Sequence, residues 1–100
     1  MAAGYVALLE IELHFPLVGS LKGKRSFVQS AKAQLQRRFG AAVAEVDHHE
    51  LWQRCRLTAA IVARDEHEAR RLADEAERWL AGQEWELVSC DRVVVRPDEL

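Results

Sequence analysis

Two hydrophobic periods alternate along this chain in an order that few folds can accommodate. Between residues 5 and 15 and between 54 and 63, apolar residues recur at every second position, as in half-buried strands. Between Ser20 and Gly40 and between Asp65 and Gly82, they recur at spacings of three and four, as in amphipathic helices. Shorter strand patterns occupy residues 43–47 and 86–95. The predicted order is strand, helix, strand, strand, helix, strand.

The ends of the two predicted helices carry residues that agree with these boundaries. Ser20 and Asp65 are favourable N-cap residues, and Glu68 gives Asp65 the spacing of a capping box. Gly40 and Gly82 stand where helices commonly end. The second helix also has a regular apolar stripe, formed by Ala69, Leu72, Ala73, Ala76 and Leu80.

This order of elements, with right-handed crossovers, predicts a ferredoxin-like βαββαβ sandwich of the α+β class. The sheet has four antiparallel strands in the spatial order 4-1-3-2, with both helices on one face. A length of 100 residues allows one such domain. Residues expected to face the helices are Leu9, Ile11, Leu13, Phe15, Ala44, Val46, Cys55, Leu57, Ala59 and Ile61. Residues expected on the uncovered face are Glu10, Glu12, His14, Arg54, Arg56 and Thr58. The facing of the last strand stays open, because Val93, Val94 and Val95 run together.

Composition indicates an ordinary water-soluble chain in the cytoplasm. Hydrophobic residues make up 49% and charged residues 30%, and no apolar run approaches the roughly 20 residues that span a bilayer. The N-terminus lacks the basic lead of a signal peptide. The net charge of −2 predicts no strong overall attraction to nucleic acid or to a membrane.

The charges are unevenly distributed. Between residues 13 and 44 there is no acid, whereas from residue 45 onward acids outnumber bases by 14 to 8. The basic residues of the first segment are Lys22, Lys24, Arg25, Lys32, Arg37 and Arg38. Three of them cluster at the start of the first helix, where the backbone N–H groups and the helix dipole favour an anion. The stripe is either a binding surface for a phosphate backbone or a solvated basic helix face.

Two segments together resemble the YlxP-like family of small bacterial proteins, over nearly the whole chain. They are SLKGKRS at residues 20–26 and AEVDHHELWQR at residues 44–54. The resemblance implies a ferredoxin-like fold and a gene neighbourhood shared with translation-initiation and ribosome-maturation factors, with no established activity. It favours RNA or a ribosomal particle as the partner of the basic stripe. The family usually has Glu where this chain has Gly23, so the capping box with Ser20 is incomplete here.

Residues 47–53 connect the second and third predicted strands and contain adjacent histidines, His48 and His49. Adjacent side chains on a strand point to opposite faces, so these two cannot bind one ion. The other histidines, His14 and His67, belong to different elements, and no zinc-type spacing occurs. We therefore expect a polar turn, without a metal or another cofactor.

Trp52 should lie on the uncovered face beside Arg54 and Arg56, unless a bulge reverses its facing. It either caps the hairpin or packs against the mate in a dimer, or it stacks on a nucleic-acid base. Trp79 and Trp85 are predicted to be packing residues.

The two cysteines, Cys55 and Cys90, are predicted to be free core residues. In the 4-1-3-2 order their strands are two spacings apart, roughly 9–10 Å, which is too far for a disulfide bond.

No catalytic constellation is recognisable in the sequence. The fold and the basic loop suggest acylphosphatase, a remote phosphate-handling alternative, but the chain contains no asparagine to position a water. Glu10 and Glu12 can be neutralised across strands by Arg54 and Arg56. We expect a non-enzymatic protein. The same charges suggest an alternative function, a homodimeric interaction module that uses the uncovered sheet face.

Overall fold

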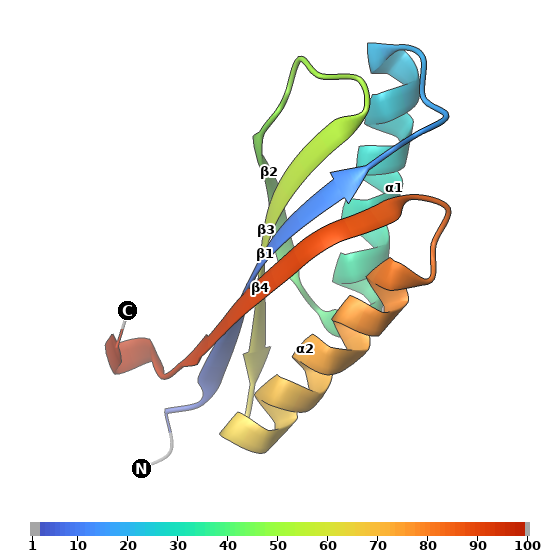
Figure 1. The fold of residues 1–100 in the computed structure, drawn as a ribbon. Coiled ribbons are helices and arrows are strands. Elements are labelled where there is room, and N and C mark those ends of the chain that lie inside the picture. Colours follow the sequence, from blue (N-terminus) through green and yellow to red (C-terminus); the bar gives the residue numbers. More distant parts are fainter. Residues whose placement is uncertain (1–2, 100) are drawn as a thin grey trace.

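The chain forms four strands and two α-helices in the predicted order. In chain order the computed structural model has β1 (Tyr5–His14), α1 (Leu21–Phe39), β2 (Ala42–Asp47), β3 (Arg54–Ala63), α2 (Glu66–Ala81), β4 (Glu86–Val95) and a 3-10 helix, η1 (Pro97–Glu99). It describes residues 3–99, so Met1, Ala2 and Leu100 of the predicted domain lie outside it. The antiparallel sheet has the order β2-β3-β1-β4, and both helices cover one face (Figure 1). The predicted ferredoxin-like fold is confirmed.

Both helices begin at the predicted caps. The Ser20 hydroxyl accepts a hydrogen bond from the Gly23 backbone N–H at 3.0 Å, and an Asp65 carboxylate oxygen accepts one from the Glu68 N–H at 2.8 Å. Helix α1 ends at Gly40, whose φ of 66° lies in the left-handed region that glycine adopts without strain.

The core lies between the sheet and the helices and includes an aromatic cluster at one end. The Trp85 indole N–H donates to the Leu80 carbonyl at 3.0 Å, and the rings of Trp79 and Trp85 are 5.9 Å apart. Phe15 and Phe27 pack against Trp85. The predicted packing roles of both tryptophans are confirmed.

The predicted facing of β2 is wrong. Val43 pairs with Ala59 and Glu45 with Leu57, so Val43 and Glu45 share the helix-covered side of the sheet. Ala44 and Val46 are exposed instead. A register shift between Glu45 and Asp47 then returns the chain to its pairing with β3 at Arg56. A short strand that alternates Ala and Val with acids has no distinct apolar face, so its neighbours decide its facing.

A second irregularity resolves the facing of β4. Leu87 pairs with Leu13 and Ser89 with Glu12, so Val88 is unpaired and exposed. Beyond this bulge Cys90 and Val94 pack against the core, while Val93 is exposed on the other side.

Both cysteines, Cys55 and Cys90, are free, as predicted. Burial raises the pKa of Cys55 to about 12 and that of Cys90 to about 11. Within residues 3–99, no helix has the length and apolar character needed to cross a bilayer.

Candidate functional site

The uncovered face of the sheet is divided into an apolar half and a charged half. Strand register aligns its residues in rows that run across the strands. The two apolar rows are Val62–Val6–Val95 and Ala42–Ala60–Leu8–Val93. The next three rows are Ala44–Thr58–Glu10–Asp91, Asp47–Arg56–Glu12–Ser89 and Arg54–His14–Glu86. We call the first two rows the apolar half and the last three the charged half.

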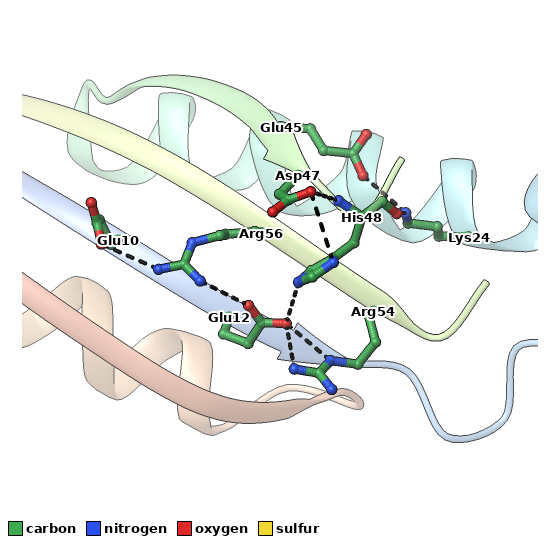
Figure 2. Close-up of polar contacts among 8 residues, drawn as sticks. All are labelled: Glu10, Glu12, Lys24, Glu45, Asp47, His48, Arg54 and Arg56. Atoms are coloured by element: carbon green, nitrogen blue, oxygen red, sulfur yellow. Dashed lines mark hydrogen bonds and ion pairs between the residues drawn. The ribbon is translucent and has the colours of Figure 1, made fainter. Parts of the chain in front are cut away.

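Glu12 is the centre of the charged half and is only 5% exposed. Arg54 contacts its Oε2 through Nη2 at 2.8 Å and Nε at 2.9 Å, and His48 Nε2 lies 3.3 Å from the same oxygen (Figure 2). Arg56 reaches Glu12 Oε1 at 3.5 Å and Glu10 Oε2 at 3.3 Å. A carboxylate this buried is tolerated because charged hydrogen-bond donors surround it. The predicted pairing of these charges across strands is confirmed.

His48 joins this cluster to the helix layer. Its φ of 62° lies in the left-handed region, which is costly for a residue with a side chain. Its N–H donates to Asp47 Oδ1 at 2.8 Å, and its carbonyl accepts a hydrogen bond from Lys24 Nζ. The imidazole thus contacts Glu12 on the uncovered side while the carbonyl serves α1 on the covered side (Figure 2).

Lys24 is not part of an exposed basic surface, contrary to the sequence-based expectation. Its side chain is 2% exposed, and Nζ lies 3.0 Å from Glu45 Oε2. The cause is the inward facing of Glu45, because a carboxylate on the helix-covered side requires a counter-charge. The segments 20–26 and 44–54 therefore meet through Lys24, Glu45 and His48.

Gln53 holds the same two regions of the chain together. Its side-chain amide donates to the carbonyls of Val18 at 3.2 Å and Pro16 at 3.3 Å. The backbone carbonyl of Gln53 accepts a hydrogen bond from the Phe15 N–H at 2.8 Å. The loop before α1 and the loop before β3 are thereby held side by side.

Three of the remaining basic residues share one face of α1. Lys22, Arg25 and Lys32 are three and seven residues apart, a spacing that places them in one stripe, with Gln29 and Gln36 between and beyond them. We call this stripe the α1 basic face. Among residues 3–99, the ion pairs include none that involves Lys22, Arg25, Lys32 or Arg37. The stripe therefore keeps its full positive charge.

The two arginines in the last turn of α1, Arg37 and Arg38, add less to the α1 basic face than the sequence suggested. Arg37 is exposed and borders the stripe at a helical rotation of about 100° from Gln36. Arg38 lies on a different side, with its guanidinium carbon 5.4 Å from the centre of the Trp79 ring and its Nε donating to Gln34. Arg38 is thus occupied by packing against α2.

A groove of about 230 Å³ runs between α1 and the end of β2. It is lined by Arg25, Gln29 and Lys32 from the α1 basic face and by His49 and Glu45 from the other wall. His49 Nε2 lies 3.1 Å from the Glu45 carbonyl oxygen. The groove thus places the basic face beside the histidine turn, where His48 and His49 have different contacts.

Trp52 lies in the loop between β2 and β3 and is 52% exposed. It borders an open hollow of about 400 Å³ together with Glu50, Leu51, Gln53 and Arg54. Arg56 does not line this hollow, and both arginines bind Glu12. The structure therefore brings Trp52 and Arg54 together but does not form a platform of one tryptophan and two free arginines, which was one of the two alternatives for Trp52.

Residues 6–92 match the model of a protein family described as "Protein of unknown function (DUF503)". The chain belongs to the DUF503 family. No match was found among curated proteins. Because the family description assigns no function, the chemistry of this DUF503 protein has to be argued from its own residues.

Sequence reasoning missed three features of the polar network in this DUF503 protein. The burial of Glu12, the inward facing of Glu45 and the positive φ of His48 were not anticipated. One signal was present for Glu12, because β1 was expected to be a central strand, where flanking side chains cover a carboxylate. Within the described residues, no group of three or more His, Cys, Asp or Glu side chains is arranged to hold a metal ion.

Proposed function

We propose that this DUF503 protein is a non-catalytic accessory factor that binds the phosphate backbone of RNA, free or in a ribosomal particle, through the α1 basic face. The observation that carries the proposal is the contrast in pairing among the described basic residues. Lys24, Arg54 and Arg56 are paired with carboxylates, whereas Lys22, Arg25 and Lys32 are not.

Unpaired basic side chains in a line suit a phosphate backbone. The stripe spans residues 22 to 32, so at 1.5 Å per residue its ends are about 15 Å apart, a length that covers several phosphates. Such contacts position a nucleic acid without reading its sequence. Three contacts predict a slope of about −2 to −3 for the logarithm of affinity against the logarithm of salt concentration. Binding should therefore be weakly selective and sensitive to salt.

The uncovered sheet face is a poorer RNA surface than α1. RNA-recognition domains stack bases on aromatic residues of the two central strands. Here the corresponding strands β1 and β3 present Glu10, Glu12, Arg56 and Thr58, none of them aromatic, and the exposed Glu10 would repel phosphates. The resemblance of segments 20–26 and 44–54 to a family encoded beside translation factors favours RNA over DNA.

The decisive experiment compares two charge-reversed variants with the same net charge. One replaces Lys22, Arg25 and Lys32 with Glu. The control replaces Arg64, Arg70 and Arg71 with Glu, because these residues lie at α2 and are already next to acids. Affinity is measured by fluorescence anisotropy with a labelled RNA hairpin, and association with ribosomal particles by sedimentation of lysate through sucrose at low and high salt.

We expect the α1 variant to lose binding by about tenfold or more and to leave the particle fractions, because it loses three phosphate contacts. The α2 control should lose much less. Equal losses in both variants would mean that only net charge matters. Absence of salt-dependent binding by the wild type would make the α1 basic face a solvated surface.

A further inference from the structure

The apolar half of the uncovered face is a continuous surface that no element within residues 3–99 covers. Val62 is 74% exposed and Val93 56% exposed, and they lie on either side of Val6 and Leu8 of β1. Isolated exposed valines are ordinary, but a contiguous patch on a two-layer fold marks an interaction surface. Both helices lie on the opposite side of the sheet (Figure 1).

We propose that two copies of this chain pack their uncovered sheet faces together, with a twofold axis that runs between β1 and β3, parallel to these strands. Rotation about this axis keeps every row at its own height along the strands. It places β3 of one copy over β1 of the other, and β2 over β4. The proposal does not depend on RNA binding.

This arrangement matches apolar rows with apolar rows. Ala60 of one copy lies over Leu8 of the second copy, and Ala42 lies over Val93. An axis perpendicular to the strands would place the row of Val62 over the row of Arg54, burying charges against valines at a high desolvation cost. The division of the face into two halves therefore selects an axis parallel to the strands.

The charges select the position of that axis. With β3 over β1, Arg56 and Arg54 face Glu12 and His14 of the second copy, and Glu10 faces Thr58. An axis centred on β1 would instead place Glu10 over Glu10 and Glu12 over Glu12, which is repulsive. A surface that carries both signs in complementary columns suits a copy of itself, whereas an anionic lipid surface would meet the exposed acids Glu10 and Asp91.

The size of the face is sufficient for a stable dimer. Three strands of 10 residues, about 34 Å long, and the 6-residue β2, about 20 Å long, at a spacing of about 4.8 Å give an area of about 600 Å² per copy. Two copies then bury about 1,200 Å², at the lower end of the range for specific interfaces. Twisted sheets pack in this aligned manner at about 10 Å separation. The α1 basic faces of both copies remain on the outside.

The first test is sedimentation equilibrium of the wild type and of a Val62→Lys, Val93→Lys double variant. Both valines are exposed, so we expect the variant to stay folded, as checked by circular dichroism. The control is an Ala33→Lys, Ala81→Lys variant, in which exposed residues of the helix layer receive the same charges. We expect the wild type and the control to be dimers and the valine variant to lose dimer affinity by about 10,000-fold, tenfold for each of the four lysines that the dimer would bury. A monomeric wild type at about 100 µM, or a valine variant that stays dimeric, overturns the proposal.

A second test reports the orientation of the two faces. Thr58→Cys is introduced in a Cys90→Ser background, because Cys55 is already buried. In the proposed dimer the two Cα atoms of residue 58 are about 11 Å apart, one strand spacing sideways and one sheet separation across, so the two introduced sulfurs, which point toward each other, lie within that distance. A bismaleimide of that reach should give a covalent dimer at low protein concentration. If Ala33→Cys in the same background cross-links and Thr58→Cys does not, the dimer forms through the helices and the proposal is wrong.

Discussion

Two groups of basic side chains in this protein carry the same charge but differ in whether a carboxylate pairs with it. Lys24, Arg54 and Arg56 bind carboxylates within the chain, and Lys24 is almost fully buried. Lys22, Arg25 and Lys32 line one face of α1 without an acidic partner among residues 3–99. Lys22 and Lys24 are only two residues apart, yet a helical rotation of about 200° separates their directions.

This difference shows how charge is divided between structure and recognition. For a buried cation that is neutralised within the chain, removing the partner destabilises the fold, because it leaves an uncompensated charge. The electrostatic potential around such a neutralised cation is weak, so it attracts a phosphate weakly. An unpaired cation contributes almost nothing to the fold but keeps its full field for a partner. Pairing, rather than the presence of Lys or Arg, therefore separates the two roles.

The largest effect should come from removing the partner of the buried lysine. Glu45→Leu leaves Lys24 charged and buried, and we expect the free energy of unfolding to fall by about 3 kcal/mol. The double variant Lys24→Met, Glu45→Leu replaces the pair with apolar groups and should recover most of this loss. Urea denaturation measures both. If the double variant is as unstable as Glu45→Leu alone, the Lys24–Glu45 pair does not explain the effect.

The next largest effect should be a difference between Glu12 and Glu10 of β1 in how much stability is lost when each is replaced. Glu12→Gln leaves two arginines without their shared carboxylate, and we expect a loss of about 2 kcal/mol, since the arginines are partly exposed and partly screened. Glu10→Gln serves as the control, because Glu10 is exposed and has one long contact with Arg56. It should cost at most about 0.5 kcal/mol. Equal losses in urea midpoints would place Glu12 among ordinary surface residues.

Lys22 and Lys24 of α1 should affect different properties: Lys22 should affect RNA binding, and Lys24 should affect stability. Lys22→Ala should change the free energy of unfolding by less than about 0.5 kcal/mol, while weakening RNA binding two- to threefold through the loss of about one phosphate contact. Lys24→Ala should destabilise the protein but leave the RNA affinity of the folded fraction unchanged. Urea denaturation and fluorescence anisotropy on the same samples test both. A selective loss of RNA affinity in Lys24→Ala would contradict the division into two groups.

The smallest effect concerns Asp47, an exposed carboxylate that contacts His48 beside the Glu12 cluster. The His48 N–H and the positive field of His48 hold the pKa of Asp47 below its ordinary value. Because the folded pKa is depressed, Asp47 stabilises the fold above its unfolded value of 3.8, and this contribution is lost as the pH falls through the folded pKa. Asp47→Asn should therefore flatten the dependence of the urea midpoint on pH below about 4. If the urea midpoint of Asp47→Asn depends on acidic pH in the same way as that of the wild type, protonation of Asp47 does not affect stability.

Much of the fold was readable from the sequence because its signals are local. The caps Ser20 and Asp65 act on N–H groups within three residues, and the alternation of β3 repeats five times over ten residues. The bounds of β3 and β4 agree with the prediction, as does the strand order. Pairing of the β1 glutamates with the β3 arginines followed from the same parity. Local periodicity thus determined the elements, their order and the polar residues of the charged half of the uncovered face.

Only the tertiary structure decided which charges are paired and which are free. Glu45 faces inward because β2 pairs with β3 in that register, and there it meets Lys24 of α1, a contact that joins residues 21 positions apart. The apolar and charged halves of the sheet face arise from register between strands that are distant in sequence, and two bulges set that register. A sequence pattern records what each residue is, whereas burial and pairing depend on which residue of another element lies opposite.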